Sequence, residues 1–343
     1  MGTIALNARF YSHAPTGMQR YGIEMAKRFS TDLHVVKPPV PLRGPEGHLW
    51  EQLYLPAASR GRLLWSPNNT GPVAVERQVC TIHDIIPLDR PEWFNARFSA
   101  WYRWLLPRLV RRVRHIIAVS EFTRQRLIDR LAVDPAKVTT VWNGVDQEFR
   151  PRSAEEIASA KRDLGIATDS YLLCVGSLEP RKNLPRLLDA WRTAMPELPS
   201  NVRLVVAGRK PASRVFAELR IEAPERVHFT GYVQQEQLPA LYSGALAMVY
   251  PSLYEGFGLP PLEAMACGTA VVTSNTTSLP EVVGSAALFV DPESTASIAE
   301  AIRTIVTDAA VRESLRAKGL VRAETFSWER CVRETRAILE AFA

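Results

Sequence analysis

Short apolar runs alternate with segments of helical periodicity along the chain, and this alternation predicts parallel β-sheets that helices cover on both faces. The apolar runs that we interpret as strands lie at 3–7, 33–36, 63–66, 79–82, 115–119, 138–141, 171–175, 203–207, 227–230, 247–250, 270–273 and 287–290. The segments that we interpret as helices lie at 18–29, 50–59, 97–113, 121–132, 184–195, 214–221, 237–243, 261–266 and 278–283. The predicted fold class is therefore α/β.

The length of the chain and one break in its pattern predict two domains. A chain of 343 residues suits about two domains of ordinary size. Pro151 interrupts regular structure between two similar halves, so we place one doubly wound, Rossmann-like domain at 1–150 and a second at 151–327. Ligands of such sheets bind beyond the carboxyl ends of the strands, and two facing edges would form one interdomain cleft.

Charge is distributed unevenly along the chain. Residues 1–150 hold 21 Lys and Arg against 13 Asp and Glu, and residues 151–343 hold 21 against 23, so the net charge of +6 divides into +8 and −2. The stretch 97–114 contains arginines and aromatic residues but no acid. Such a basic amphipathic helix suits the surface of an anionic membrane. The residues that we expect at that surface are Arg97, Trp101, Trp104, Arg108, Arg111 and Arg112.

Two other interpretations of this helix stay open. An ordinary domain helix would bury its apolar face in the core and leave its arginines in solvent. A nucleic-acid-binding protein would also use the arginines. No recognised nucleic-acid motif accompanies them, however, so we expect no nucleic-acid partner.

Cysteine use and the lack of long apolar runs indicate a protein of the cytoplasm. The cysteines are scattered, without a C-x-x-C pair, as expected for buried thiols in a reducing compartment. No run approaches the ~18 apolar residues of a membrane span, and the first residues enter a strand-like run without a basic leader. We expect a cytoplasmic protein that attaches peripherally to the inner face of the plasma membrane.

The segment 251–273, PSLYEGFGLPPLEAMACGTAVVT, has the character of a ligand site at the start of a helix. Gly256 and Gly258 let the backbone approach a ligand, and the amides of the first helical turn suit a diphosphate. Glu263 can accept hydrogen bonds from a ribose, and Glu255 can accept them from a hexose. Diphosphate, ribose and hexose together make a nucleotide sugar. The simpler interpretation, a helix start with solvated glutamates, is weaker because apolar runs flank the motif.

A pair of cations follows the predicted strand at 171–175. Arg181 and Lys182 come shortly after Gly176, and a guanidinium beside an ammonium can hold a diphosphate. The chain contains no Asp-x-Asp sequence, so a dedicated metal site for the diphosphate is not expected. We predict a metal-independent protein without a cofactor. A solvated basic pair is the alternative.

The first half has its own candidates near strand ends. His83 and Asp84 follow the predicted strand at 79–82, where a histidine could contact a sugar or position a hydroxyl. Gly17 opens the first predicted helix, and Ser120 is a candidate N-cap of the helix at 121–132. Alternatively, His83 is a buried core residue whose hydrogen bonds are made within the protein and which has no role toward a ligand.

Together these segments resemble glycosyltransferase family four, whose signature is E-x7-E and whose members are retaining enzymes with the GT-B fold. The resemblance covers nearly the whole chain. It implies that the residues taking part in the reaction are His83, Glu255, Arg181 and Lys182. The donor-binding residues that it implies are Gly17, Met18, Gly176, Gly231, Tyr232, Gly256, Phe257, Gly258, Leu259 and Glu263. It leaves Asp84 and Ser120 as candidates on the acceptor side.

The same resemblance implies that a last helix at 328–343 crosses back onto the first domain, with packing on the second domain as the alternative. The segment 82–94, IHDIIPLDRPEWF, is similar to mannosyltransferases of bacterial polysaccharide assembly. We therefore expect a retaining hexosyltransferase that moves mannose from GDP-mannose to a lipid-linked saccharide in surface-polysaccharide synthesis. Retention without a protein nucleophile implies front-face transfer.

Several rival functions stay open. Within the same fold, the donor could be GDP-rhamnose or UDP-glucose, because no residue reads the base unambiguously. A nucleotide-sugar epimerase and a soluble enzyme similar to glycogen synthase are further alternatives. A non-catalytic nucleotide-sugar-binding subunit would keep Glu263 and Arg181 but would not need His83 and Glu255.

Overall fold

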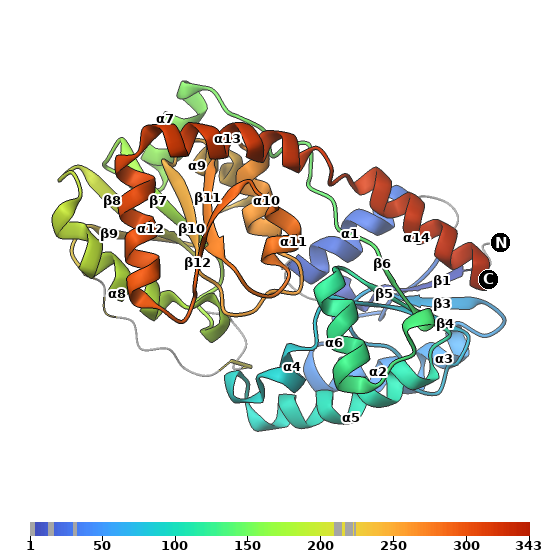
Figure 1. The fold of residues 1–343 in the computed structure, drawn as a ribbon. Coiled ribbons are helices and arrows are strands. Elements are labelled where there is room, and N and C mark those ends of the chain that lie inside the picture. The colour runs from blue at the N-terminus through green and yellow to red at the C-terminus, as the bar shows by residue number, and fades with distance from the viewer. Residues whose placement is uncertain (1–3, 13–16, 30–32, 209–214, 217–221, 223) are drawn as a thin grey trace. The chain divides into compact units, whose positions relative to one another are not determined.

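The computed structural model describes residues 4–12, 17–29, 33–208, 215, 216, 222 and 224–343. The chain divides into two compact units. The first unit comprises Met1–Pro91, Ala96–Gly144 and Ser327–Ala343, and the second comprises Glu92–Asn95 and Val145–Phe326. Each unit is an α/β structure built on its own sheet (Figure 1).

The first unit holds a parallel six-stranded sheet in the order β2-β1-β3-β4-β5-β6. Its strands are β1 (Ile4–Asn7), β2 (Leu33–Val36), β3 (Leu63–Ser66), β4 (Gln78–Ile82), β5 (His115–Ala118) and β6 (Val138–Thr140). Its helices are α1 (Gly17–Phe29), α2 (Gly44–Leu53), α3 (Leu55–Ala58), α4 (Ile86–Asp89), α5 (Ala96–Arg112), α6 (Glu121–Leu131) and α14 (Trp328–Phe342). The inner strands are buried on both faces, and the edge strand β2 is partly exposed. Burial on both faces is why the inner strands read as continuous apolar runs.

The last helix, α14, packs on α1 in the first unit (Figure 1). Ser327 caps it by accepting a hydrogen bond from the Arg330 amide at 3.2 Å. The Cys331 sulfur lies 3.7 Å from the sulfur of Met25 on α1. A Cβ atom at Gly144 would stand 2.2 Å from the Trp328 nitrogen, so only glycine allows the chain to pass this close to α14.

The second unit holds a parallel six-stranded sheet in the order β12-β11-β10-β7-β8-β9. Its strands are β7 (Ser170–Val175), β8 (Val202–Ala207), β9 (Val227–Gly231), β10 (Ala247–Tyr250), β11 (Ala270–Ser274) and β12 (Ala287–Val290). Its helices are α7 (Ala154–Asp163), α8 (Leu184–Ala194), α9 (Leu238–Ser243), α10 (Leu259–Ala266), α11 (Leu279–Val283), α12 (Thr295–Thr307) and α13 (Ala309–Ala323). Helices α8 and α12 share one apolar core with the sheet (Figure 1). The strand order reverses between β7 and β10, which is the switch point where ligands of such sheets bind.

The structure differs from the sequence-based prediction mainly in its helices. Helices α7, α12 and α13 were not among the predicted elements, and the predicted helix at 214–221 lies outside the described residues except for 215 and 216. The single helix predicted at 50–59 is two, α2 and α3, because Pro45 and Pro56 each take up an early helical position. Helix α10 begins at Leu259 rather than at Pro261. None of the helices in the described part of the chain combines the length and apolar character of a membrane span.

Candidate active site

The switch point of the second unit gathers polar residues from the loops that follow β7 and β10. Gly176, directly after β7, has φ +149° and donates its backbone N–H to the Ala207 carbonyl at 2.9 Å. The short 3-10 helix η5 (Pro180–Lys182) then carries Arg181 and Lys182. A Cβ atom at Gly176 would lie 3.3 Å from Cε of Lys182, so the glycine leaves room for the lysine side chain.

Glu255, in the loop after β10, is the centre of this cluster. Its Oε1 accepts hydrogen bonds from Nζ of Lys182, Oη of Tyr250 and Oγ of Ser252, each at 2.7 Å. Its Oε2 accepts from Nη1 of Arg181 at 2.5 Å. Lys182 also donates to the Tyr250 hydroxyl, which therefore links the cation to the carboxylate. The structure thus brings Arg181, Lys182 and Glu255 into direct contact.

Burial and the neighbouring charges shift the pKa values of the side chains in this cluster. Burial raises the pKa of Glu255, but the charges of Arg181 and Lys182 and the donated hydrogen bonds outweigh it and lower that pKa to about 2. Burial and the charge of Arg181 lower the pKa of Lys182, whereas the Glu255 carboxylate raises it. The carboxylate lies 2.7 Å from Nζ, and on this geometry we treat the pair as ionised. Burial, followed by the charge of Glu255, holds the pKa of Tyr250 well above its usual value.

Charge in the cluster is nearly balanced. Nη2 of Arg181 lies 2.6 Å from Oε1 of Glu179, and Nη1 contacts Glu255. The two cations therefore face two buried carboxylates. An anion that reaches Arg181 or Lys182 must compete with a carboxylate that is already bound. This competition was not part of the sequence-based prediction, which gave Glu255 and the cations separate partners.

The turn from Glu255 to Leu259 presents backbone donors. Gly258 has φ +119°, and a Cβ atom there would lie 2.9 Å from the Leu279 side chain. Oγ of Ser278 donates to the carbonyls of Glu255 at 2.9 Å and Phe257 at 2.6 Å, which fixes the turn.

Within the described residues, the N–H groups of Phe257, Gly258 and Leu259 have no acceptor. Pro260 and Pro261 have no N–H, so the donors available to a ligand at this helix start are the amide of Leu259, the first residue of α10, and the two amides before it. An orphaned backbone donor in a buried turn indicates a site for an anion.

Two further predicted donor contacts lie on the same unit. Glu263 sits on α10, is 6% exposed, and accepts a hydrogen bond from Oη of Tyr242 at 3.1 Å. Gly231 ends β9 with φ +72° and accepts from the Gly208 amide at 2.8 Å. Tyr232, the next residue, is 53% exposed. Their assignment to ribose and base stays a prediction.

His83, in the first unit, is held as a neutral ring. Its Nε2 lies 2.8 Å from the Pro67 carbonyl, which can only accept, so Nε2 carries the proton and Nδ1 is an acceptor. Burial lowers the pKa of His83 to about 4 although the Pro67 carbonyl raises it. The ring packs edge-on against Tyr21, at 4.8 Å between centroids. Asn69, with φ +60°, accepts from the His83 amide at 2.6 Å and donates to the Asp84 carbonyl at 3.2 Å.

The other candidates of the first unit have structural roles in this structure. The Asp84 carboxylate accepts from the Ile86 amide at 3.2 Å and so helps to start α4. Ser120 is fully buried and caps α6 by accepting from the Thr123 amide at 3.0 Å. The Met18 carbonyl accepts from Asn68 at 2.6 Å, and Gly17 is the first residue of α1. Roles for these residues toward a donor or an acceptor stay predictions.

Helix α5 buries one face and exposes arginines on the other. Its buried residues are Ser99, Tyr102, Leu105, Leu106, Leu109 and Val110. Trp104 is 41% exposed, and the guanidinium of Arg108 lies 5.1 Å from its ring centre. Trp101 is partly buried against the core, and its ring lies tilted beside that of His48 at 4.9 Å between centroids, so its place at a membrane surface stays a prediction. Arg97, Arg111 and Arg112 are exposed, and Arg112 pairs with Glu76 at 3.0 Å.

Sequence reasoning missed the residues that hold this site together. Tyr250 was interpreted only as a strand end and Ser252 only as part of the motif at 251–273, although polar residues after a buried strand are a usable signal. Asn69 gave no signal, because its contact with His83 joins two loops across the sheet edge. In the described part of the chain, no group of His, Cys, Asp and Glu side chains could hold a metal ion.

Two family descriptions match the chain: "Glycosyl transferases group 1" over residues 156–321 and "Glycosyltransferase Family 4" over residues 64–149. The chain is 36% identical over 272 residues to O-antigen chain mannosyltransferase B of Escherichia coli, which covers 78% of this chain and 71% of that protein. The chain belongs to the group 1 glycosyltransferases. This bears out the family predicted from the sequence.

Other relatives of this glycosyltransferase carry similar names. It is 30% identical over 249 residues to O-antigen chain mannosyltransferase RfbU of Salmonella typhimurium, which covers 71% of this chain and 65% of that protein. It is 33% identical over 261 residues to the serotype-specific mannosyltransferase WbdA of Escherichia coli. That match covers 74% of this chain but 32% of WbdA, so the chain spans about a third of that relative.

Solved structures agree on the fold. Anabaena HepE, solved in complex with UDP and glucose, matches with a TM-score of 0.78 at 17% identity, over 99% of this chain and 100% of that one. WaaG, a glycosyltransferase involved in lipopolysaccharide biosynthesis, matches with a TM-score of 0.74 at 16% identity, over 98% and 99%. The glycosyltransferase therefore has the two Rossmann-like units of the GT-B fold, as the sequence predicted.

Proposed function

We propose that this glycosyltransferase is a retaining mannosyltransferase that takes mannose from GDP-mannose and adds it to a lipid-linked saccharide in bacterial surface-polysaccharide synthesis. The names of relatives at 30–36% identity support mannose and O-antigen assembly. The observation that carries the proposal is the buried cluster of Arg181, Lys182 and Glu255 at the switch point, beside a turn of orphaned amides. Such a site combines cations, amide donors and a carboxylate, which a nucleotide sugar requires.

The donor would enter by exchanging partners in the cluster. Its diphosphate would take Lys182 and Arg181 away from Glu255 and accept hydrogen bonds from the turn at 257–259. The carboxylate of Glu255, relieved of its cations, would then accept hydrogen bonds from the hydroxyls of the mannose. In this way the protein supplies the charge stabilisation that a metal ion supplies in other transferases. Glu263 would hold the ribose.

Transfer itself would run on one face of the sugar. The bond between the sugar and the phosphate oxygen breaks, the acceptor oxygen forms the new bond on the same face, and the acceptor proton passes to the departing phosphate. His83 would accept a hydrogen bond at Nδ1 from a sugar hydroxyl, because its ring is neutral and its Nε2–H is engaged. A neutral His83 positions the sugar and does not act as an acid.

We propose further that α5 attaches the enzyme to an anionic membrane. The exposed Trp104, the cation over its ring and the row of arginines support this proposal. A lipid-linked acceptor would be presented at the same surface. GDP-rhamnose and UDP-glucose remain the competing donors, and a binding subunit without activity remains the competing class.

The proposal is tested by mannose transfer from labelled GDP-mannose to a membrane extract, with GDP-rhamnose and UDP-glucose in parallel. Lys182→Ala is expected to lower kcat/KM by about 100-fold or more, as loss of a charge-stabilising donor does in other enzymes. Lys318→Ala removes an exposed lysine on α13 and serves as the control. Equal activity of the two variants, or transfer from another donor only, would contradict the proposal.

A further inference from the structure

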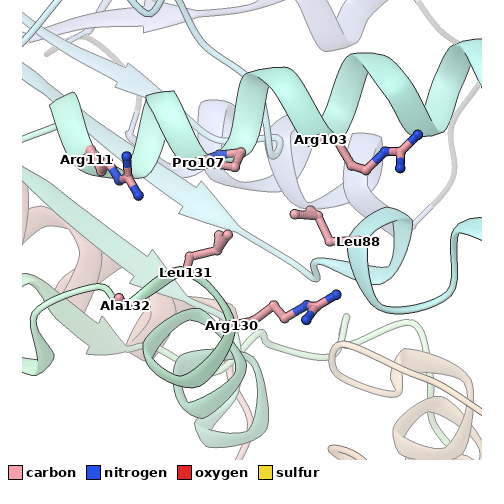
Figure 2. Close-up of a pocket in the computed structure, with 7 residues that line it drawn as sticks. All are labelled: Leu88, Arg103, Pro107, Arg111, Arg130, Leu131 and Ala132. Atoms are coloured by element: carbon pink, nitrogen blue, oxygen red, sulfur yellow. The ribbon is translucent and has the colours of Figure 1, made fainter.

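A hollow of about 380 Å³ lies along α5 in the first unit. Its lining residues are Leu88, Arg103, Pro107, Arg111, Arg130, Leu131 and Ala132. Figure 2 shows Arg103, Pro107 and Arg111 on one side of α5, facing Arg130 and Leu131 at the end of α6. The hollow therefore has an arginine from α5 at each end and a third from α6 opposite them.

The hollow carries an excess of positive charge. Within the described residues, no carboxylate pairs with Arg103 or Arg111. The nearest acid is Asp89, whose Oδ1 lies 3.8 Å from Nε of Arg130. Both Asp89 oxygens already accept from Arg126, at 2.9 and 2.6 Å, so Asp89 is largely neutralised by another residue. Arg103 and Arg111 are thus available to an anion, and in the described part of the chain Arg130 is paired only with a carboxylate that it shares with Arg126.

The floor of the hollow is apolar. Leu88, Pro107 and Leu131 separate the arginines. Pro107 lies inside α5, where proline is unfavourable by about 3 kcal/mol because it has no N–H to donate. Arg103, Pro107 and Arg111 follow each other at intervals of four residues and so share one stripe of the helix. An anion with no apolar part would use the arginines but not this floor.

A second hollow, of about 550 Å³, lies on another side of the same helix. It is lined by Gln52, Val73, Ala74, Trp104, Arg108, Arg111 and Arg112. Arg111 lines both hollows, and the exposed Trp104 belongs to the second. Arginine-edged hollows on both sides of one helix suit a surface with many phosphates rather than a single soluble ligand.

We propose that the hollow between α5 and α6 binds the phosphate of an anionic phospholipid headgroup. Arg103, Arg111 and Arg130 hold the phosphodiester through charge-assisted hydrogen bonds. Leu88, Pro107 and Leu131 receive the first carbons of the lipid, which distinguishes this site from one for free phosphate. This inference rests on the proposed membrane attachment of α5 and adds a residue, Arg130, from outside that helix. Such a site would make the membrane attachment of the enzyme selective for lipids with a phosphate group, and not merely for a negatively charged surface.

The test measures binding of three soluble probes by titration calorimetry: dihexanoyl phosphatidylglycerol, inorganic phosphate and farnesyl diphosphate. The variant Arg103→Gln/Arg130→Gln should bind the phosphatidylglycerol about 30-fold more weakly, since each arginine near a lipid phosphate contributes about fivefold. The control Arg60→Gln/Arg333→Gln removes the same charge from exposed positions without a described partner. It should stay within about twofold of the unaltered enzyme.

A second variant separates shape from charge. Leu88→Phe fills the floor and leaves every arginine in place, so it should weaken phosphatidylglycerol binding without changing the affinity for inorganic phosphate. Equal losses in the two arginine pairs would show general charge attraction and overturn the proposal. Tighter binding of inorganic phosphate would show a free-phosphate site, and tighter binding of farnesyl diphosphate a site for a carrier lipid; both also overturn it.

The two proposals fail separately. None of these positions belongs to the cluster around Glu255, so mannose transfer to a water-soluble acceptor should be unchanged in all of the variants. If neither the variants nor the unaltered enzyme transferred mannose, the proposed function would be refuted. The lipid titrations would still decide whether the hollow binds a phospholipid headgroup. Attachment to vesicles of phosphatidylcholine with phosphatidylglycerol, measured by sedimentation, should fall with the calorimetric affinity.

Discussion

Tyr250→Phe tests whether the hydroxyl that bridges Lys182 and Glu255 stabilises the donor site. Tyr250 is fully buried, and its Oη donates to Oε1 of Glu255 at 2.7 Å and accepts from Lys182. Removing the hydroxyl deletes one hydrogen bond to a charged group, which contributes about 1.5–3 kcal/mol. The remaining donors to Glu255, from Ser252, Lys182 and Arg181, keep the carboxylate paired. We therefore expect the loss of about 2 kcal/mol in the free energy of unfolding of the second unit.

A matched control exists in the same sheet. Tyr171 is also fully buried, and its Oη donates at 2.7 Å to a neutral acceptor, the Leu241 carbonyl. Tyr171→Phe should cost about 1 kcal/mol, half the cost of Tyr250→Phe, because hydrogen bonds to a charged acceptor are about twice as strong. Urea denaturation of both variants measures the difference. In a thermal scan, Tyr250→Phe should lower the melting temperature by about 4–8 °C for a unit of this size.

Function should separate the two variants further. Tyr250→Phe disturbs the position of Lys182, so we expect its kcat/KM for donor to fall while that of Tyr171→Phe stays near the unaltered value. The pKa of Glu255 should also rise in Tyr250→Phe, because one of the hydrogen bonds that lower it is lost. Equal unfolding free energies in the two variants, together with unchanged kcat/KM, would refute this reasoning.

Three further predictions follow from the buried charges. Because burial lowers the pKa of His83 to about 4, log(kcat/KM) should show no inflection near pH 6.5; an inflection there that His83→Asn removes would contradict the neutral ring. The pKa of Glu255 is lowered from 4.5 to about 2, so its stabilisation is present above pH 4.5 and is lost as the pH falls toward 2. Urea denaturation across this range should show a decrease of up to about 3 kcal/mol in the free energy of unfolding that Glu255→Gln lacks; parallel curves would be the contrary result. Glu51, fully buried, accepts from Asn7 at 2.7 Å and from Thr70 at 2.9 Å and faces Arg9 at 3.5 Å. Glu51→Ala should destabilise the first unit by about 3–5 kcal/mol, because it leaves the buried charge of Arg9 without a carboxylate partner. A loss below about 1 kcal/mol in the same assay would contradict this reasoning.

The strands could be predicted from the sequence because burial on both faces gives them continuous apolar runs. All twelve begin and end within one residue of the predicted ranges. The helices were harder to predict from the sequence: α7 was not among the predicted elements, although Ser153 and Glu156 form a capping box at its start. Helices α12 and α13 were also missed, although each starts with a recognisable N-cap: Ser294 accepts from the Ser297 amide and Asp308 from the Val311 amide.

The site could be predicted as a set of residues but not as a set of contacts. Glu255 and Lys182 lie 73 residues apart in the sequence, and only the adjacency of β7 and β10 brings them together. Sequence spacing does show that a carboxylate and two cations follow strand ends. It does not show that they neutralise one another, which depends on side-chain direction in the folded loops. For the same reason, helical spacing alone did not separate the partly buried ring of Trp101 from the exposed ring of Trp104.

The central claim is that Lys182 and its neighbours grip the diphosphate of a GDP-linked sugar without a metal ion. Titration calorimetry with GDP-mannose in the presence of EDTA, on the unaltered enzyme and on Lys182→Ala, tests it most directly. The account predicts binding by the unaltered enzyme and at least about a tenfold loss of affinity in the variant, as expected for a charge-assisted hydrogen bond. Binding that requires an added metal, or equal affinity in the two proteins, would contradict it.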